Sequence, residues 1–199
     1  MPFLIDPRKY TDNDISWEDV WPKDKQTNAY VSLGKRNGQT TALEGPIPYR
    51  FGGGKLLSAD TLPDVLPGRW SRNMFVSERV KQAICALDRV SHNFIPLELD
   101  VKGTILKDTH FLFTTGDLTD AIIAEKSDVL PNYVESTGKL GFYSTPSKPQ
   151  IVWKQTEIEG RAIWVDRYLS SQFFISGDLL QMLKDLGAGR FQAIPSFAE

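Results

Sequence analysis

Nucleophilic catalysis needs a base beside a nucleophile, and the sequence offers few candidates for either role. The chain has two histidines, His92 and His110, and it lacks the Gly-x-Ser-x-Gly turn that exposes a catalytic serine. The single cysteine, Cys85, lies in a segment with the apolar spacing of a helix, where we expect a small thiol to fill the core rather than react. The sequence therefore predicts no nucleophilic site.

Metal and phosphate sites are also not predicted. Two isolated histidines without cysteine partners do not make a zinc site, and the run from Asp12 to Asp14 lacks the glycine and the final glutamate of a calcium loop. The run from Arg50 to Lys55 places three glycines between two cations, but Tyr49 and Leu56 stand where a phosphate-binding loop needs a glycine and a hydroxyl. A turn between two short strands is the simpler interpretation. We expect no metal and no cofactor.

Two pairs of carboxylates have spacings that could serve acid–base chemistry if they lined a cleft: Glu157 with Glu159, and Asp117 with Asp120. Residues of this type are usually solvated on a surface, and we expect the same here. An enzyme that acts on a small ligand stays an alternative. It would require these carboxylates and a histidine to converge in one deep pocket.

The elements that would position any site include two similar segments about a hundred residues apart. The segment from Phe75 to Leu87 aligns without a gap on the segment from Phe174 to Leu186. In each, a serine (Ser77 or Ser176) directly precedes an apolar series with helical spacing, as is typical of a helix N-cap after a strand. We expect the helical leucines and isoleucine of both copies to be buried: Ile84, Leu87, Leu183 and Leu186.

The remaining pattern favours an α+β fold with a mixed or mostly antiparallel sheet. Runs of apolar, β-branched and aromatic residues predict strands at 28–33, 47–51, 93–99, 110–115, 151–153, 161–166 and 190–194. A short helix is expected at 117–126, and a hairpin or tight reversal at 154–161 with Gly160 at its end. Gly187 and Gly189 can end the second helix in a left-handed conformation.

Glycine and proline are concentrated in the first part of the chain, so long regular elements are not expected there. We interpret residues 1–68 as a loop-rich N-terminal layer that packs on the main domain. Residues 69–199 form that main α+β domain in this interpretation.

The composition is that of an ordinary folded protein: 199 residues, 41% hydrophobic, 24% charged. A net charge of -2 does not indicate nucleic acid or a membrane surface as a partner. One cysteine cannot form an internal disulfide, and the N-terminus has no basic region of a secretory signal, so we expect a cytoplasmic location. No apolar run approaches the length of a membrane-spanning helix.

The charges are unevenly distributed along the chain. Residues 98–135 carry eight acidic residues and three lysines, and residues 10–20 carry four acidic residues and no basic one. Residues 69–89 have the opposite balance, with five basic residues and two acidic ones. Segregated charge can orient a partner of opposite charge, although charged residues also simply cover solvated faces.

Three blocks in this order resemble the immunity-protein 11 family of bacterial polymorphic toxin systems. They are 75–84, then 111–115 with 117–121, then 163–167 with 174–176 and the closing helix. The resemblance covers roughly residues 69–197. It implies a small cytoplasmic protein, encoded beside a toxin, that binds the cognate toxin and blocks it without catalysis. No binding residue of the family can be transferred to this sequence.

The acidic N-terminal stretch lies outside the family-like region, so specificity for one toxin could reside there. It combines two tryptophans with acidic residues, a composition found in binding hot spots. The candidate partner-binding residues are Asp12, Asp14, Trp17, Glu18, Asp19 and Trp21. The alternative is that the tryptophans attach the N-terminal layer to the domain. A regulatory module that forms a homo-oligomer through an apolar patch is a further alternative.

Overall fold

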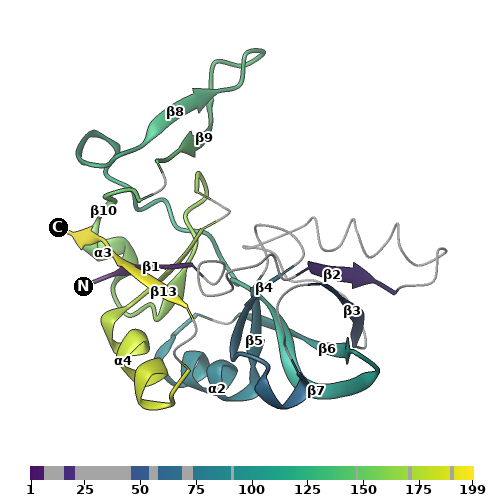
Figure 1. The fold of residues 1–199 in the computed structure, drawn as a ribbon. Helices are drawn as coiled ribbons and strands as arrows, with labels where there is room; N and C mark the ends of the chain where they lie inside the picture. The colour runs from purple at the N-terminus through teal and green to yellow at the C-terminus, as the bar shows by residue number, and fades with distance from the viewer. Residues whose placement is uncertain are drawn as a thin grey trace.

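The computed structural model describes residues 1–6, 16–20, 46–53, 58–68, 74–90, 92–146, 148–169, 172–188 and 191–199. In these residues the chain forms two main β-sheets, helices that pack beside them and a hairpin that projects from the body (Figure 1). Most strand pairs are antiparallel, and the pairs β3–β6 and β10–β14 are parallel. The fold thus has mixed sheets and few helices, in agreement with the expected class at this level.

The larger sheet has the strand order β2-β3-β6-β7-β5-β4. Its strands are β2 (Ser16–Asp19), β3 (Ile47–Gly53), β6 (Asn93–Val101), β7 (Thr104–Thr114), β5 (Met74–Ser77) and β4 (Val65–Pro67). Every second residue of β6 from Ile95 onward is buried, which is the period of a strand with one face on a core. Lys102 and Gly103 both have positive φ, as a two-residue turn between β6 and β7 requires.

The smaller sheet has the order β11-β12-β1-β13, with every pair antiparallel. Its strands are β11 (Ile163–Trp164), β12 (Phe173–Ile175), β1 (Phe3–Asp6) and β13 (Gln192–Pro195). Beside it, β10 (Val152–Trp153) pairs with β14 (Phe197–Ala198). Strand β1 therefore lies inside a sheet built from the C-terminal part of the chain, and β3 pairs with β6. The division of the chain at residue 68 stays a prediction.

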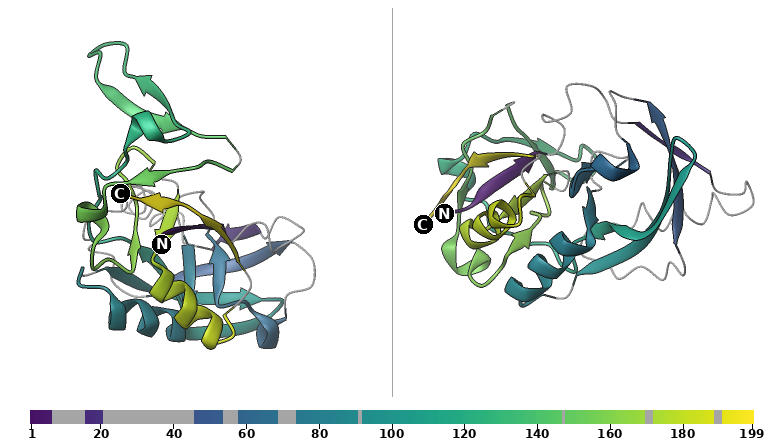
Figure 2. Two further views of the ribbon diagram at one scale, coloured as in Figure 1. Left: turned by 90° about the vertical axis from the view of Figure 1, so that its left-hand side faces the viewer. Right: turned by 60° about the horizontal axis from the view of Figure 1, so that its bottom comes forward.

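The two serine-capped helices are confirmed. Helix α2 (Glu78–Leu87) follows β5, and its N-cap Ser77 accepts a hydrogen bond from Val80 N at 3.4 Å. Helix α4 (Gly177–Asp185) follows β12, and Ser176 accepts from Leu179 N at 3.1 Å. The two helices lie side by side (Figures 1 and 2). The repeated sequence thus builds one paired helical layer. The other short helices are α3 (Gln155–Ile158), η2 (Ala59–Thr61) and η3 (Ala124–Lys126).

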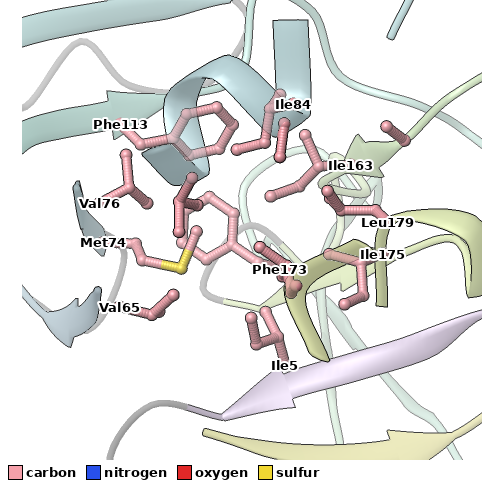
Figure 3. Close-up of a cluster of buried hydrophobic side chains, with 14 of the residues drawn as sticks. Ile5, Val65, Met74, Val76, Ile84, Phe113, Ile163, Phe173, Ile175 and Leu179 are labelled. Atoms are coloured by element: carbon pink, nitrogen blue, oxygen red, sulfur yellow. The ribbon is translucent and has the colours of Figure 1, made fainter. Parts of the chain in front are cut away.

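The repeated strands are apolar at consecutive positions because both of their faces are buried. Met74 and Val76 of β5 face a core shared with both helices, whereas Phe75 between them faces a second core. Strand β12 follows the same rule, with Ile175 in the shared core and Phe174 in a third cluster. Figure 3 shows side chains of both sheets and both helices converging in the shared core.

Two predictions about helix burial are wrong. Ile84 and Leu183 are each 1% exposed as expected and Leu87 is partly buried, but Leu186 is 37% exposed because it is the C-cap, beyond the last turn that packs. Cys85 is exposed. Successive residues of a helix are rotated by about 100°, so Cys85 does not lie on the buried face that carries Ile84.

Several loops also differ from expectation. Residues 117–123 form no helix, because Thr119 and Ile122 make isolated bridges to Asp166 and Trp153 instead. Residues 154–161, expected as a hairpin or a tight reversal, contain the single helical turn α3, and Gly160 follows it with φ 73°. Gly187 has φ 68°, as expected for a helix end.

The expected strands at 47–51, 93–99, 110–115, 151–153, 161–166 and 190–194 are each found as a strand with shifted bounds. The run from Arg50 to Lys55, expected as a turn, continues strand β3 as far as Gly53. Its last two residues, the expected strand at 28–33 and Gly189 lie outside the described residues.

Candidate partner-binding surface

The predicted N-terminal site is only partly within the described residues. Trp17, in β2, is 3% exposed, and its ring centroid lies 5.9 Å from that of Phe51 and 5.6 Å from that of Phe75. This position matches the alternative in which the tryptophan attaches the N-terminal layer to the domain. Glu18 is exposed on the same strand. Asp12, Asp14 and Trp21, and the side chain of Asp19, lie outside the described residues.

A different surface carries half of the large apolar side chains that are exposed in the described residues. Strands β8 (Leu130–Tyr133) and β9 (Leu140–Ser144) form an antiparallel hairpin that projects away from both sheets (Figures 1 and 2). Four of the eight large apolar side chains exposed in the described residues belong to it. They are Leu130 at 71%, Tyr133 at 62%, Phe142 at 56% and Val134 at 46%. Such a cluster, unlike scattered apolar residues, is typical of an interaction surface.

The base of this hairpin is attached to the body. Tyr143 N donates to Tyr168 O at 2.8 Å, and the two tyrosine rings pack edge to face with centroids 5.7 Å apart. Gln172 Nε2 donates to Thr145 Oγ1 at 3.0 Å. Burial raises the pKa of the Tyr143 phenol, so the hydroxyl is neutral near pH 7. The root of the hairpin is thus attached to the fold, whereas the side chains of Leu130, Tyr133, Val134 and Phe142 along it stay exposed.

The tip of the hairpin has a defined turn. Val134 O accepts hydrogen bonds from Thr137 N at 3.1 Å and Gly138 N at 2.8 Å, and Gly138 has φ 64°. A bulge at Gly141 shifts the register. A Cβ at Gly141 would lie 3.2 Å from Val134 Cγ2, so glycine is favoured there.

A serine, an aspartate and a histidine meet beneath helix α2, but not as a catalytic triad. Ser77 Oγ donates to Asp64 Oδ1 at 2.6 Å, while His110 Nε2 lies 3.0 Å from the carbonyl of Pro63. A carbonyl oxygen can only accept, so Nε2 carries a proton. Arg79 binds Asp64 and also donates to Leu186 O at 2.9 Å. The cluster therefore connects β4, α2 and the end of α4.

The burial of His110 predicts a loss of stability in mild acid. Burial lowers the pKa of the 5% exposed His110 below its ordinary value of 6.5, because the imidazolium form loses hydration. The unfolded chain binds this proton more readily, so the free energy of unfolding falls as the pH drops below 6.5 toward the lowered folded pKa. We expect a lower urea midpoint at about pH 5.5 than at about pH 7.5. His110→Gln should reduce that difference, and an unchanged difference would contradict this assignment.

The other titratable candidates do not converge on one site. His92 Nε2 lies 3.0 Å from Asp88 Oδ2, and its Nδ1 accepts from Gly116 N at 3.2 Å. Asp117 binds Arg161 through two hydrogen bonds of 2.7 and 2.9 Å, so it is not simply solvated. The other three carboxylates of the candidate pairs are exposed, as expected: Asp120, Glu157 and Glu159.

A cavity of about 250 Å³ lies between the first residues, α3 and the start of α4. Its lining includes Trp164, Glu159 and Asp178, and neither histidine lines it. In the part of the chain that the structure describes, no three His, Cys, Asp or Glu side chains gather as a metal would require. The described helices include none with the length and apolar character needed to span a membrane.

The model of the immunity protein family Imm11 matches residues 33–194 of this chain. The match begins well before residue 69, and it includes β3, whose buried Ile47 and Tyr49 belong to the core of the larger sheet. The resemblance found in the sequence did not include β3, because β3 is a single short apolar run in a segment rich in glycine and proline. Residues 10–20 remain outside the match. No curated protein matches the chain.

Proposed function

Because the chain belongs to the immunity protein family Imm11, we propose that it binds one cognate bacterial toxin and neutralises it in the cytoplasm of the producing cell. The mechanism proposed is stoichiometric, non-catalytic protein–protein contact. The match over residues 33–194 carries this proposal, since it spans most of both sheets and both serine-capped helices.

The use of the polar groups supports the same mechanism. The histidines, which would be the natural acid–base residues, have their ring nitrogens engaged by scaffold atoms: the Pro63 carbonyl and Thr109 for His110, and Asp88 and Gly116 N for His92. Half of the large exposed apolar side chains in the described residues are instead gathered on the β8–β9 hairpin. These features suit a protein that recognises another protein.

The test uses the protein encoded by the adjacent reading frame. We expect the purified chain to form a stable complex with it, and co-expression to protect cells from it. Adding the chain in increments should abolish toxin activity at about one equivalent, because a bound inhibitor acts stoichiometrically. Neutralisation by trace amounts would favour the enzyme alternative, and the absence of both complex and protection would contradict the proposed function.

The acidic N-terminal stretch gives a prediction about association. If it attracts a basic toxin, replacing Asp14, Glu18 and Asp19 together by serine should slow association and flatten its dependence on salt. The fold should be nearly unchanged, because exposed charges contribute little to stability. Stopped-flow mixing at low ionic strength measures the rate, with Asp60→Ser as a control at an exposed carboxylate elsewhere in the chain. An unaltered rate would remove this stretch from the interface.

A further inference from the structure

We propose that the β8–β9 hairpin is the element that contacts the toxin directly and that the toxin receives it in an apolar recess. This inference rests on the proposed function, which supplies the partner. The hairpin lies in the region matched by the family model, and it exposes Leu130, Tyr133, Val134 and Phe142 to solvent. Its first strand and Glu135 belong to the acidic stretch 98–135.

The apolar side chains lie on both faces of the hairpin. Residues directly opposite in an antiparallel pair point to the same side, and Asn132 lies opposite Phe142. Leu130, two residues from Asn132, therefore shares the face of Phe142, and the 2.8 Å hydrogen bond from Asn132 Nδ2 to Ser144 Oγ lies on that face. Tyr133 points to the other side. A flat partner surface would cover one face, whereas a recess covers both.

The strand edges of the hairpin are poor sites for pairing with a further strand. Tyr143 N donates to Tyr168 O, so one position on the outer edge of β9 is already occupied. Pro131, opposite Tyr143, has no N–H to offer on the outer edge of β8. Recognition therefore depends on the exposed side chains rather than on extension of the sheet.

The area of this surface distinguishes the toxin from a second copy of the chain. Large side chains have roughly 150–250 Å² of surface each. Because the four are only 46–71% exposed, together they present about 350–600 Å². A stable interface buries about 800 Å² on each partner. A symmetric pair of hairpins would cover one face of each and stay well below that value. A recess that surrounds the hairpin and reaches its root can approach it, which favours the toxin as occupant.

The first experiment compares variants of each face with a matched control. Leu130→Ser combined with Phe142→Ser removes one face, and Tyr133→Ser removes the other. Ile105→Ser, a residue of β7 that is 49% exposed, is the control. Calorimetry should show each face variant binding the toxin at least about 30-fold more weakly, as for hot-spot residues, and the control within about 3-fold of wild type. Unchanged urea midpoints would show that the fold is intact.

A second measurement locates the contact without any substitution. Amide hydrogens of a two-stranded hairpin exchange readily, so exchange in residues 130–144 should slow strongly when the toxin binds. Wild-type affinity in both face variants, or unchanged exchange in 130–144 in the complex, would overturn the proposal. So would a dimer of the free chain that these variants dissociate without loss of toxin binding. If the wild-type chain itself does not bind, the proposed function fails, which is a distinct result.

Discussion

Replacing Asp88 by alanine should lower the free energy of unfolding by about 3–5 kcal/mol, the range for removing one partner of a buried charged network. The Asp88 side chain is 0% exposed. Its Oδ2 accepts from Ala162 N at 2.8 Å and Ile163 N at 2.9 Å, and its Oδ1 accepts from Val90 N at 2.9 Å. Alanine would leave these donors without an acceptor, and each such loss is costly away from water.

The carboxylate also connects parts of the chain that are distant in sequence. Asp88 is the C-cap of α2, Ala162 and Ile163 lead into β11, and His92 precedes β6. Burial alone would raise the pKa of Asp88. The nearby His92 ring and the hydrogen bonds from backbone N–H groups outweigh burial, so the pKa of Asp88 lies below its ordinary value of 3.8. The stabilisation is therefore present above pH 3.8 and is lost as the pH falls through the lower folded pKa.

Two control variants test this account of Asp88. Asp60→Ala removes an exposed carboxylate and should change the free energy of unfolding by less than about 0.5 kcal/mol. Asp88→Asn keeps one acceptor oxygen and the side-chain shape, so its loss should lie between the two alanine variants. Urea unfolding at neutral pH measures all three. If Asp88→Ala is as stable as Asp60→Ala, the network does not hold β11 to the end of α2.

The parts of the fold that depend on neighbouring residues could be predicted from the sequence. A serine before an apolar series is enough to place the starts of α2 and α4, because the cap bonds span three residues. The position of β6 is also a local matter, because apolar and other residues alternate along it from Ile95 onward. The loop 117–123 has helical apolar spacing, but the carboxylate of Asp166, 45 residues away, binds Ala121 N at 2.9 Å and replaces the helix hydrogen bond. Distant partners of this kind leave no local signal.

The candidate surface could not be predicted because exposed and buried apolar residues look the same in a sequence. Leu130 and Phe142 are as apolar as the core residues, and 130–144 lacks a clear period. Conversely, Trp17 sits among acidic residues, as an interface anchor would, yet packs on Phe75. Which of these side chains is covered depends on whether another part of the chain reaches it. The tertiary fold decides this. The family resemblance indicated the class of partner, a toxin, but not which residues of this chain contact it.

A comparison of the two leucines near the end of α4 shows that the helical pattern of a sequence does not by itself decide which side chains are buried. Leu183 and Leu186 belong to one apolar series, but Leu183 is 1% exposed in the shared core and Leu186 is 37% exposed at the C-cap. Leu183→Ala should therefore lower the free energy of unfolding by about 2–5 kcal/mol, because it removes buried methyl groups and leaves a cavity. Leu186→Ala should lower it by less than about 1 kcal/mol, since its side chain already meets water.

Both leucine variants keep the backbone carbonyl of Leu186, so the hydrogen bond from Arg79 remains in each. The comparison thus isolates side-chain packing, and alanine favours the helix in both positions. Urea unfolding of the two variants beside wild type gives the difference directly. If the two variants lost equal free energy of unfolding, the buried Leu183 would contribute no more than Leu186 at the helix end. That result would contradict the packing of α4 against α2 that the structure describes.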